Sequence, residues 1–476
     1  MLSISNSGLL IDKKTFEKLI DKYKMKKFTV RERLPQGTPS VIQRHPRVLK
    51  LFKSSKDHIV LARGLLELVQ KNTDIKLDVK FNKCRKFDKF SLGDNLASHQ
   101  EVVLNEVVCR FSNEDKFGSY LMQLAPGLGK TRTAIAIIGQ VGATTLVVVP
   151  CKHIALQWIE EMEQFTPHLK TCIYNNKTNQ SAQNFDVILC IINTARDKDC
   201  DFFSQFAFAI MDEVHEHISN CNKEILWKTS WCRFVLGMSG TLAPSDVKNE
   251  LLPYIEAHLG KVVHSRDLDG FDTVAKEFDV NVEIVEYIGN EEYLTPVLND
   301  GGTISFVNTL SRIISDPQRI DLVLNKIREL YDKKCNIFVF GEHRGYLDNL
   351  YERLVKVYEK DEIDLESNAD VLKGGATKDK IEKCKTHRII LTTFSYSRRG
   401  IDYSHLDALV LATPRKSGIK QIIGRILRFS GNSSIPRYIL DVWDSATVLK
   451  SQLYERQKVY RSRLYKISKT KIEGNL

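Results

Sequence analysis

The sequence predicts an α/β protein with two tandem parallel-sheet domains, a basic N-terminal accessory region and a basic C-terminal helix. Three observations predict this organisation. From Leu96 onward, strand-length apolar stretches alternate with glycine or proline turns and amphipathic helical patterns, which is typical of a parallel sheet covered on both faces. The chain has 476 residues, too many for one compact core. Basic charge is concentrated at both ends.

The accessory region covers residues 1–90. Within Lys13–Lys27, apolar residues recur at helical spacing, and His58–Ala62 has the composition of a strand. The lysine-rich stretch Lys80–Lys89 marks the expected end of this region.

The first sheet domain is expected over residues 91–245 and the second over residues 316–445. The strands predicted for the first are Tyr120–Leu124, Thr145–Val149, Asp186–Ile192, Phe206–Met211 and Phe234–Met238. Those predicted for the second are Asn336–Phe340, Arg388–Thr392, Ala408–Ala412 and Arg437–Leu440. Residues 246–315 form a linker or the start of the second domain, because Val280–Tyr287 alternates like a strand.

The tail, residues 446–476, admits two interpretations. Leu449, Leu453, Tyr460 and Leu464 recur at near-helical spacing, which predicts a helix packed on the second domain with a basic outer face. Tyrosines interleaved with arginines and lysines are also typical of a surface that stacks bases. We favour the packed helix.

The formal net charge of +11 is unevenly distributed. Residues 1–90 hold 22 Lys+Arg against 9 Asp+Glu, residues 446–476 hold 8 against 2, and the remainder carries a net −8. Basic flanks attract a phosphate backbone, although a solvated lysine-rich surface explains the charge equally well.

Composition excludes several classes of protein. The ten cysteines include no Cys-x-x-Cys pair, which argues against a disulfide framework or a zinc ribbon and for reduced thiols inside a cell. No apolar stretch approaches the roughly 20 residues that span a bilayer. Ile11-Asp-Lys-Lys14 interrupts the apolar stretch near the N-terminus, so we expect no signal peptide.

The first candidate site is Gly127-Leu-Gly-Lys-Thr131, which follows a predicted strand and opens a helical stretch. Glycines permit close backbone approach, and successive N–H groups at a helix start bind phosphates. Lys130 is expected to reach the β- and γ-phosphates of ATP and Thr131 to bind Mg²⁺. Leu124 stands where the full P-loop pattern has its first glycine. The residues expected to line the nucleotide are Pro126, Gly127, Leu128, Gly129, Lys130, Thr131 and Arg132.

The second candidate site is Asp212-Glu213, which ends the predicted strand Phe206–Met211. A carboxylate at the end of a central strand can hold Mg²⁺, which we expect of Asp212, while Glu213 orients and deprotonates the attacking water. Both candidate sites fall at the carboxyl ends of strands, where such sheets bind ligands. These residues predict an ATPase. They also explain His215-Glu-His217 better than a separate metal site does.

Together with further motifs, these residues resemble the superfamily 2 helicases. In family order, the others are Ser98-His-Gln-Glu101, Val148-Val-Pro150 with Leu156-Gln-Trp158, Ser239-Gly-Thr241, Thr392-Thr-Phe with Arg399-Gly-Ile-Asp402, and Gln421-Ile-Ile-Gly-Arg-Ile-Leu-Arg428. Their joint order makes a chance match of any one motif a poor explanation. The resemblance implies two RecA-like domains that clamp ATP, and movement along a nucleic-acid strand when the γ-phosphate leaves.

The resemblance also implies roles for individual residues. Gln100 would read adenine, Gly400 and Asp402 would meet the nucleotide and the domain interface, and Arg425 and Arg428 would be arginine fingers on the γ-phosphate. The implied nucleic-acid contacts are Pro150, Gln157, Trp158, Thr392 and Thr393.

Looser patterns resemble the XPB-like branch, most of all the helicases of large DNA viruses, namely the poxvirus transcript-release helicase and its iridovirus homologues. The Arg-Glu-Asp motif of the XPB type is missing. The resemblance implies DNA as the partner, with RNA as an alternative, and contacts with RNA polymerase or other transcription or replication proteins. It implies an intracellular setting, in a virion or cytoplasmic viral factory, or in the nucleus if the viral resemblance does not hold.

The leading hypothesis is therefore an ATP-dependent, DNA-directed helicase that uses Mg²⁺ and acts in viral transcription or replication. One alternative is a duplex translocase or transcript-release ATPase that separates no strands, and another is an RNA helicase. A third is a binding protein in which ATP only switches the affinity for nucleic acid.

Overall fold

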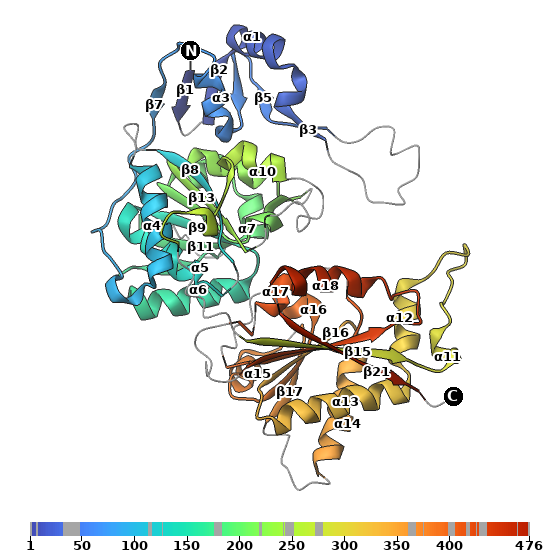
Figure 1. Ribbon diagram of the computed structural model, residues 1–476. Helices are drawn as coiled ribbons and strands as arrows, with labels where there is room; N and C mark the ends of the chain where they lie inside the picture. Colours follow the sequence, from blue (N-terminus) through green and yellow to red (C-terminus); the bar gives the residue numbers. More distant parts are fainter. Residues whose placement is uncertain are drawn as a thin grey trace. The chain divides into compact units, whose positions relative to one another are not determined.

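A computed structural model describes the chain in two compact units, Met1–Thr273 and Val274–Leu476 (Figure 1). The described residues are 2–5, 8–31, 48–112, 117–125, 127–175, 183–218, 221–240, 242, 252–271, 279–359, 368–374, 376–397, 405–415, 419–424, 426–427, 436–463 and 465–474. All ten cysteines are free thiols. Among the described helices, none has both the length and the apolar character that a membrane span requires.

The N-terminal region forms a sheet of its own, in the order β5-β6-β2-β1-β7. Its strands are Leu2–Ser5 (β1), Gly8–Asp12 (β2), Phe52–Ser54 (β5), His58–Leu61 (β6) and Asp78–Lys80 (β7), and Thr29–Arg31 (β3) pairs separately with Val48–Lys50 (β4). The predicted helix begins at Lys13 because Asp12 caps it, accepting a hydrogen bond from the Thr15 amide at 2.8 Å. This helix, Lys13–Tyr23 (α1), is followed by Met25–Phe28 (η1), Arg63–Leu65 (η2) and Leu66–Gln70 (α3).

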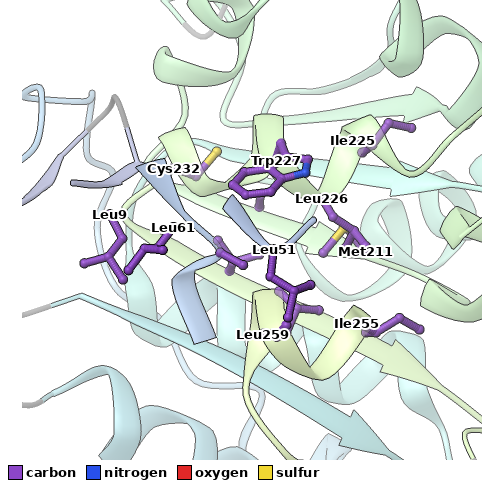
Figure 2. Packing of buried hydrophobic residues seen from close by; sticks show 14 of the residues in the cluster. Leu9, Leu51, Leu61, Met211, Ile225, Leu226, Trp227, Cys232, Ile255 and Leu259 are labelled. Atoms are coloured by element: carbon purple, nitrogen blue, oxygen red, sulfur yellow. The ribbon is translucent and has the colours of Figure 1, made fainter. Parts of the chain in front are cut away.

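The N-terminal sheet shares one hydrophobic core with the following domain. Leu9 and Leu61 of the sheet lie in the same cluster as Trp227, Cys232 and Leu259 (Figure 2). Burial of this apolar surface fixes the accessory region to the sheet domain of the same unit.

Arg63 and Gly64 close this junction with polar and steric contacts. The buried Arg63 guanidinium donates to the backbone carbonyls of Cys232 at 2.6 Å, Gly118 at 3.2 Å and Arg233. A Cβ on Gly64 would lie 2.5 Å from the Glu256 carbonyl, so only glycine fits. Since Gly118 and Arg233 stand where two central strands begin, the accessory region lies at the amino ends of those strands.

The first large sheet has seven parallel strands in the order β10-β11-β9-β12-β13-β8-β14. They are Gly118–Gln123 (β8), Thr145–Val149 (β9), Thr171–Ile173 (β10), Val187–Ile191 (β11), Phe208–Met211 (β12), Phe234–Ser239 (β13) and Val262–His264 (β14). The helices are Ser98–Phe111 (α4), Lys130–Val141 (α5), Lys152–Phe165 (α6), Ile192–Asp197 (α7), Cys200–Ser204 (α8), Glu224–Lys228 (α9) and Leu252–Leu259 (α10). Apolar side chains cover both faces, as the continuous apolar strands predict.

The second unit contains another seven-stranded parallel sheet, in the order β17-β18-β16-β19-β20-β15-β21. Its strands are Val280–Ile288 (β15), Ile337–Gly341 (β16), Ala369–Leu372 (β17), Ile389–Thr393 (β18), Ala408–Leu411 (β19), Arg437–Asp444 (β20) and Lys466–Glu473 (β21). Its helices are Glu291–Leu294 (α11), Phe306–Ile314 (α12), Pro317–Asp332 (α13), Arg344–Glu359 (α14), Lys378–Cys384 (α15), Phe394–Ser397 (α16), Ile419–Ile423 (α17) and Gln452–Ser462 (α18). The predicted α/β class with two parallel sheets is confirmed.

Residues 246–315, left between the two predicted domains, contribute to both units. Helix α10 and strand β14 belong to the first unit, and β15 belongs to the second. The expected domain boundaries at residues 90, 245, 315 and 445 stay predictions.

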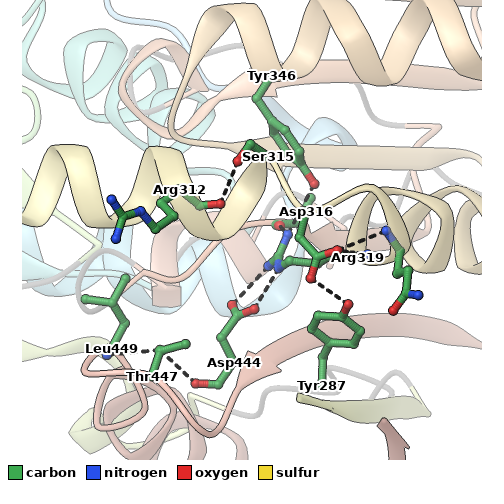
Figure 3. Close-up of polar contacts among 11 residues, drawn as sticks. Tyr287, Arg312, Ser315, Asp316, Arg319, Tyr346, Asp444, Thr447 and Leu449 are labelled. Carbon is green, nitrogen blue, oxygen red and sulfur yellow. Dashed lines mark hydrogen bonds and ion pairs between the residues drawn. The ribbon is translucent and has the colours of Figure 1, made fainter. Parts of the chain in front are cut away.

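A buried ion pair crosses the second unit. The guanidinium of Arg319 on α13 donates to both carboxylate oxygens of Asp444 on β20, at 2.6 and 3.0 Å, and to the carbonyl of Ala412 at 2.9 Å. Asp316 caps α13 and accepts a hydrogen bond from Tyr287 at 2.7 Å (Figure 3). These contacts fix α13 against the ends of β15 and β20.

The tail contains the predicted packed helix, because Leu453 and Tyr460 of α18 are buried. The basic side chains of this helix are not all on its outer face, because Arg456 is buried and donates to Asp441 at 2.8 Å. The tail also adds β21, a strand that the sequence did not predict, parallel to β15. Lysines of β21 pair with acidic residues beside them, including Lys469 with Glu286, so charge pairing takes the place of an apolar pattern.

Candidate active site

The candidate site lies at the carboxyl ends of three adjacent strands. Strand β13, ending at Ser239, lies between β12 and β8, so it separates Asp212-Glu213 from the glycine-rich loop that follows β8. The loop is tied to the middle strand, because the Leu124 amide donates to the Ser239 carbonyl at 3.1 Å. The parallel order of the strands thus brings together two motifs about 80 residues apart in the chain.

The loop has the backbone of a phosphate cradle. Gly127 and Gly129 have φ values of +88° and +71°, which favour glycine, and α5 begins at Lys130 directly after them. Leu124 is buried in the apolar core. The position that lacks the first P-loop glycine therefore holds a core side chain.

Gln100 braces this loop from α4. Its side-chain amide nitrogen donates to the carbonyls of Leu128 at 3.3 Å and Gly129 at 3.2 Å, and its oxygen accepts from the Ala97 amide at 2.9 Å. A Cβ on Gly129 would overlap that amide nitrogen. Gln100 is buried, so what the structure shows is a brace, and the adenine contact stays a prediction.

Glu213 lies among cationic and hydroxyl groups. Lys130 Nζ is 3.4 Å from Glu213 Oε1, and the Ser239 hydroxyl donates to Oε2 at 3.1 Å. His215 Nδ1 lies 2.7 Å from that hydroxyl and 3.4 Å from Oε2. Glu213 has φ +47°, unusual for a residue other than glycine, and such backbone strain concentrates at functional sites.

Asp212 is buried and held on both oxygens. The Trp158 indole donates to Oδ2 at 3.0 Å and the Glu213 amide to Oδ1 at 2.9 Å, while His217 Nε2 lies 3.1 Å from its backbone carbonyl. Burial and the neighbouring Glu213 charge raise the pKa of Asp212 to about 6. Burial also acts to raise the pKa of Glu213, but Lys130 and His215 outweigh it and hold that pKa below its usual range.

Three of the residues predicted to contact nucleic acid, Trp158, Thr392 and Thr393, have buried side chains. Trp158 has no exposed surface and uses its indole nitrogen on Asp212. Thr392 is buried and donates to the Leu372 carbonyl at 2.7 Å, and the buried Thr393 hydroxyl accepts from the Tyr396 amide at 3.3 Å. These side chains face the protein interior, because apolar strand and helix periodicity buries them. Their side chains bond to groups of the protein itself, and their nucleic-acid contacts stay predictions.

The remaining predicted residues are placed as follows. Pro150 and Gln157 are half-buried, as is Thr131, and the Arg132 guanidinium stacks 4.2 Å from the Phe165 ring centroid. Their ligand contacts stay predictions. Five others lie outside the described residues, as does Thr241 of the Ser239 motif: Pro126, Gly400, Asp402, Arg425 and Arg428.

The sequence missed the contacts that organise the two carboxylates. Trp158 was predicted to contact nucleic acid, not Asp212. The contact of His217 with the Asp212 carbonyl and the hydrogen bond between His215 and Ser239 were not predicted. The Asp-Glu-x-His spacing signals a contact for His215, but its partner lies 24 residues away on another strand, where only the sheet order brings it near.

Comparison with known proteins agrees with this geometry. Residues 94–244 match the family model described as "Type III restriction enzyme, res subunit". A protein of African swine fever virus (strain Badajoz 1971 Vero-adapted), named "Putative ATP-dependent RNA helicase", is 35% identical over 370 residues, covering 74% of this chain and 70% of that protein. The chain belongs to the superfamily 2 helicases.

Other similar proteins extend the match over more of the helicase. A protein of Invertebrate iridescent virus 6, named "Putative helicase", is 25% identical over 452 residues, covering 89% of this chain and 95% of that protein. The solved structure of S. cerevisiae Dbp5 bound to RNA and ADP BeF3 shares the fold, with 14% identity, a TM-score of 0.52, and coverage of 80% of this chain and 94% of that chain. The predicted kinship with helicases of large DNA viruses is confirmed, and this chain is an ATP-dependent enzyme of that family.

Proposed function

We propose that this helicase hydrolyses ATP between its glycine-rich loop and Glu213, and uses the energy to move along DNA and separate its strands. The observation that supports this most is the cluster of Lys130, Glu213 and Ser239 at adjacent strand ends, with Asp212 held beside them. Phosphoryl transfer to water requires a cation that binds the phosphates and a base that takes the proton of the water. Lys130, at the start of α5, is that cation. Glu213 is that base, and the Ser239 hydroxyl holds it.

Each residue has a distinct role in the proposed chemistry. Lys130 binds the terminal phosphates, and in doing so it leaves Glu213, its partner at 3.4 Å. Glu213, held by Ser239, then orients the attacking water and accepts its proton. Ser239 links this base to the end of β13, and by resemblance the Ser239-Gly-Thr241 motif couples hydrolysis to movement.

The acidic and hydroxyl groups fit Mg²⁺. Each Asp212 oxygen accepts one hydrogen bond and keeps a lone pair, and carboxylate and hydroxyl oxygens are the ligands this ion prefers. Thr131 and Asp212 would hold the ion. When bound, Mg²⁺ neutralises charge on the phosphates.

By resemblance, the second unit supplies Arg425 and Arg428 as fingers on the γ-phosphate, and Gly400 and Asp402 beside the nucleotide. A planar guanidinium suits the oxygens of a transferring phosphoryl group.

Two substitutions test the ATPase site. Lys130→Ala and Glu213→Gln are expected to abolish ATP hydrolysis while leaving the circular dichroism spectrum unchanged. A matched control is Lys152→Ala, on the surface at the start of α6, which should hydrolyse ATP at the wild-type rate. Undiminished turnover in either site variant would refute the assignment.

RNA is the second candidate substrate, because the 35%-identical viral relative is named as an RNA helicase. ATPase rates measured in parallel with single- and double-stranded DNA and RNA decide between them. Greater stimulation by DNA and release of a strand from a tailed DNA duplex are the expected results. Greater stimulation of the ATPase by RNA than by DNA would make RNA the proposed substrate. Stimulation of the ATPase by DNA without release of a strand would indicate a translocase.

The N-terminal accessory region offers a phosphate-binding surface. Over residues 13–28, seven lysines are exposed against two acidic residues, namely Lys13, Lys14, Lys18, Lys22, Lys24, Lys26 and Lys27 against Glu17 and Asp21. Lys14, Lys18 and Lys22 recur every four residues, so they form one stripe with a rise of about 6 Å between neighbours. Such a stripe matches the spacing of phosphates along a strand to within a few ångströms.

The role of this stripe can be measured directly. Lys14→Gln with Lys18→Gln should weaken binding to every nucleic-acid sequence and reduce the salt dependence of binding by about two ions. Lys71→Gln, an exposed lysine paired with Glu67 elsewhere in the accessory region, is the control. If the salt dependence of nucleic-acid binding is unchanged in the double variant, the stripe does not bind nucleic acid and is assigned to a protein partner.

A further inference from the structure

A second cluster of chemically active side chains lies in the second unit, separate from the ATPase residues. Asp370 on β17, Cys384 at the end of α15 and His387 just before β18 bring their ligand atoms within 4.8 Å of one another. Cys384 and His387 stand three residues apart, a spacing that lets both side chains of a turn reach one ion.

Two members of the cluster are buried, and one of them has a ring nitrogen without a hydrogen-bond partner. His387 and Cys384 are 1% and 0% exposed. His387 Nδ1 has no hydrogen-bond partner in the part of the chain that the structure describes. A buried ring nitrogen without a partner destabilises the folded state, so a ligand on that nitrogen would remove the penalty.

Asp370 has an oxygen to offer. Its Oδ1 atom takes both the Val371 amide at 2.7 Å and Lys380 Nζ at 2.8 Å, and neither contact uses Oδ2. The Asp370 side chain is 18% exposed, which gives an ion a path from solvent. We propose that Asp370, Cys384 and His387 bind one Zn²⁺ ion, with water as the fourth ligand.

The chemistry and the dimensions both suit zinc. A thiolate, an imidazole and a carboxylate are its usual ligands, with bonds of about 2.0–2.3 Å. In a tetrahedral site these lengths place ligand atoms about 3.5 Å apart. Atoms already within 4.8 Å therefore need side-chain shifts of about 1 Å to close around the ion, while the backbone stays in place.

The site would have a structural role. It joins the edge strand β17, the end of α15 and the residue that leads into β18, and β17 pairs with β18 from Ala369 opposite Ile389. An ion that binds the folded state and not the unfolded state stabilises the folded state by mass action. We therefore expect the second unit to unfold at a higher temperature with zinc than with a chelator.

Metal content tests the proposal in the full-length chain. After equilibration with zinc and dialysis, the wild type should retain about one zinc ion per chain by mass spectrometry, and Cys384→Ser and His387→Gln should bind zinc at least about tenfold more weakly. Cys335→Ser, a buried cysteine of the same unit outside the cluster, should keep it. Equal zinc in all four proteins, or none in the wild type, would overturn the site.

Cobalt substitution provides a readout that needs no variant. Co²⁺ in the wild type should give a thiolate charge-transfer band in the near ultraviolet and visible bands of a tetrahedral ion. If Cys384→Ser does not fold, Asp370→Asn serves instead, because Asp370 is partly exposed. Loss of the tetrahedral visible bands in Asp370→Asn supports the site, and absence of the charge-transfer band in the wild type overturns it.

Discussion

The indole nitrogen of Trp158 donates a hydrogen bond to Asp212 Oδ2 at 3.0 Å, although 54 residues separate the two in the chain. Both side chains are buried. Trp158 lies on α6 and Asp212 directly follows β12, with β10, β11, α7 and α8 between them in the chain. The bond therefore connects the motif expected to meet nucleic acid with the proposed Mg²⁺ ligand. A shift of α6 would therefore change the position of the Asp212 carboxylate.

Trp158→Phe removes this donor and keeps most of the ring. We expect the Mg²⁺ concentration for half-maximal ATPase activity to rise about tenfold, because groups that orient a metal ligand typically contribute that much. Trp227→Phe is the matched control, since Trp227 is also buried and donates to the Tyr254 hydroxyl at 3.0 Å. An equal Mg²⁺ requirement in both variants would contradict the role given to Trp158.

The pH dependence of hydrolysis should reflect Asp212. Its pKa is raised to about 6, so the carboxylate takes up a proton as the pH falls through about 6 and then binds Mg²⁺ poorly. We expect kcat/KM to fall below that pH and the fall to move to lower pH at higher Mg²⁺ concentration. Burial lowers the pKa of His217 to about 4, so His217 stays neutral here. A profile that is flat down to pH 5 would refute this assignment.

Gln100→Ala distinguishes the observed brace from the predicted adenine contact. Two hydrogen bonds to loop carbonyls are lost, and at about 1 kcal/mol each KM should rise by up to about thirtyfold. If Gln100 acts only on the loop, KM for ATP and KM for GTP rise by the same factor. A larger rise for ATP than for GTP would instead support the adenine contact.

Removing one partner of the Arg319–Asp444 pair should destabilise the second unit more than replacing both partners by apolar residues. Arg319→Met leaves Asp444 as an uncompensated buried charge, which we expect to destabilise the second unit by about 3–5 kcal/mol. Arg319→Met with Asp444→Leu should be less destabilising than Arg319→Met alone. Hydrogen exchange of α13 and β20 peptides measures both. A double variant worse than the single one would indicate that hydrogen bonding at Asp444 dominates.

Much of the fold followed from local patterns. Apolar strands of four to seven residues between helices predicted both parallel sheets, and Thr145–Val149 was predicted with the bounds that the structure has. Strand β21 was missed because its residues are almost all exposed and follow no apolar alternation, although it pairs with β15 along its whole length. Apolar periodicity in a sequence reveals which face of a strand is buried, and an exposed edge strand has no buried face to reveal.

The sequence by itself determined the chemistry of this protein: a lysine and threonine after a glycine turn, an Asp-Glu pair after a buried strand, and the order of the motifs. These signals are local, since each depends on a few neighbouring residues and their backbone. Only the tertiary structure decided that Trp158 serves Asp212, that Gln100 braces the loop, and that Cys384 and His387 meet Asp370. Those relationships depend on strand order and helix packing, which join residues that no spacing in the chain connects.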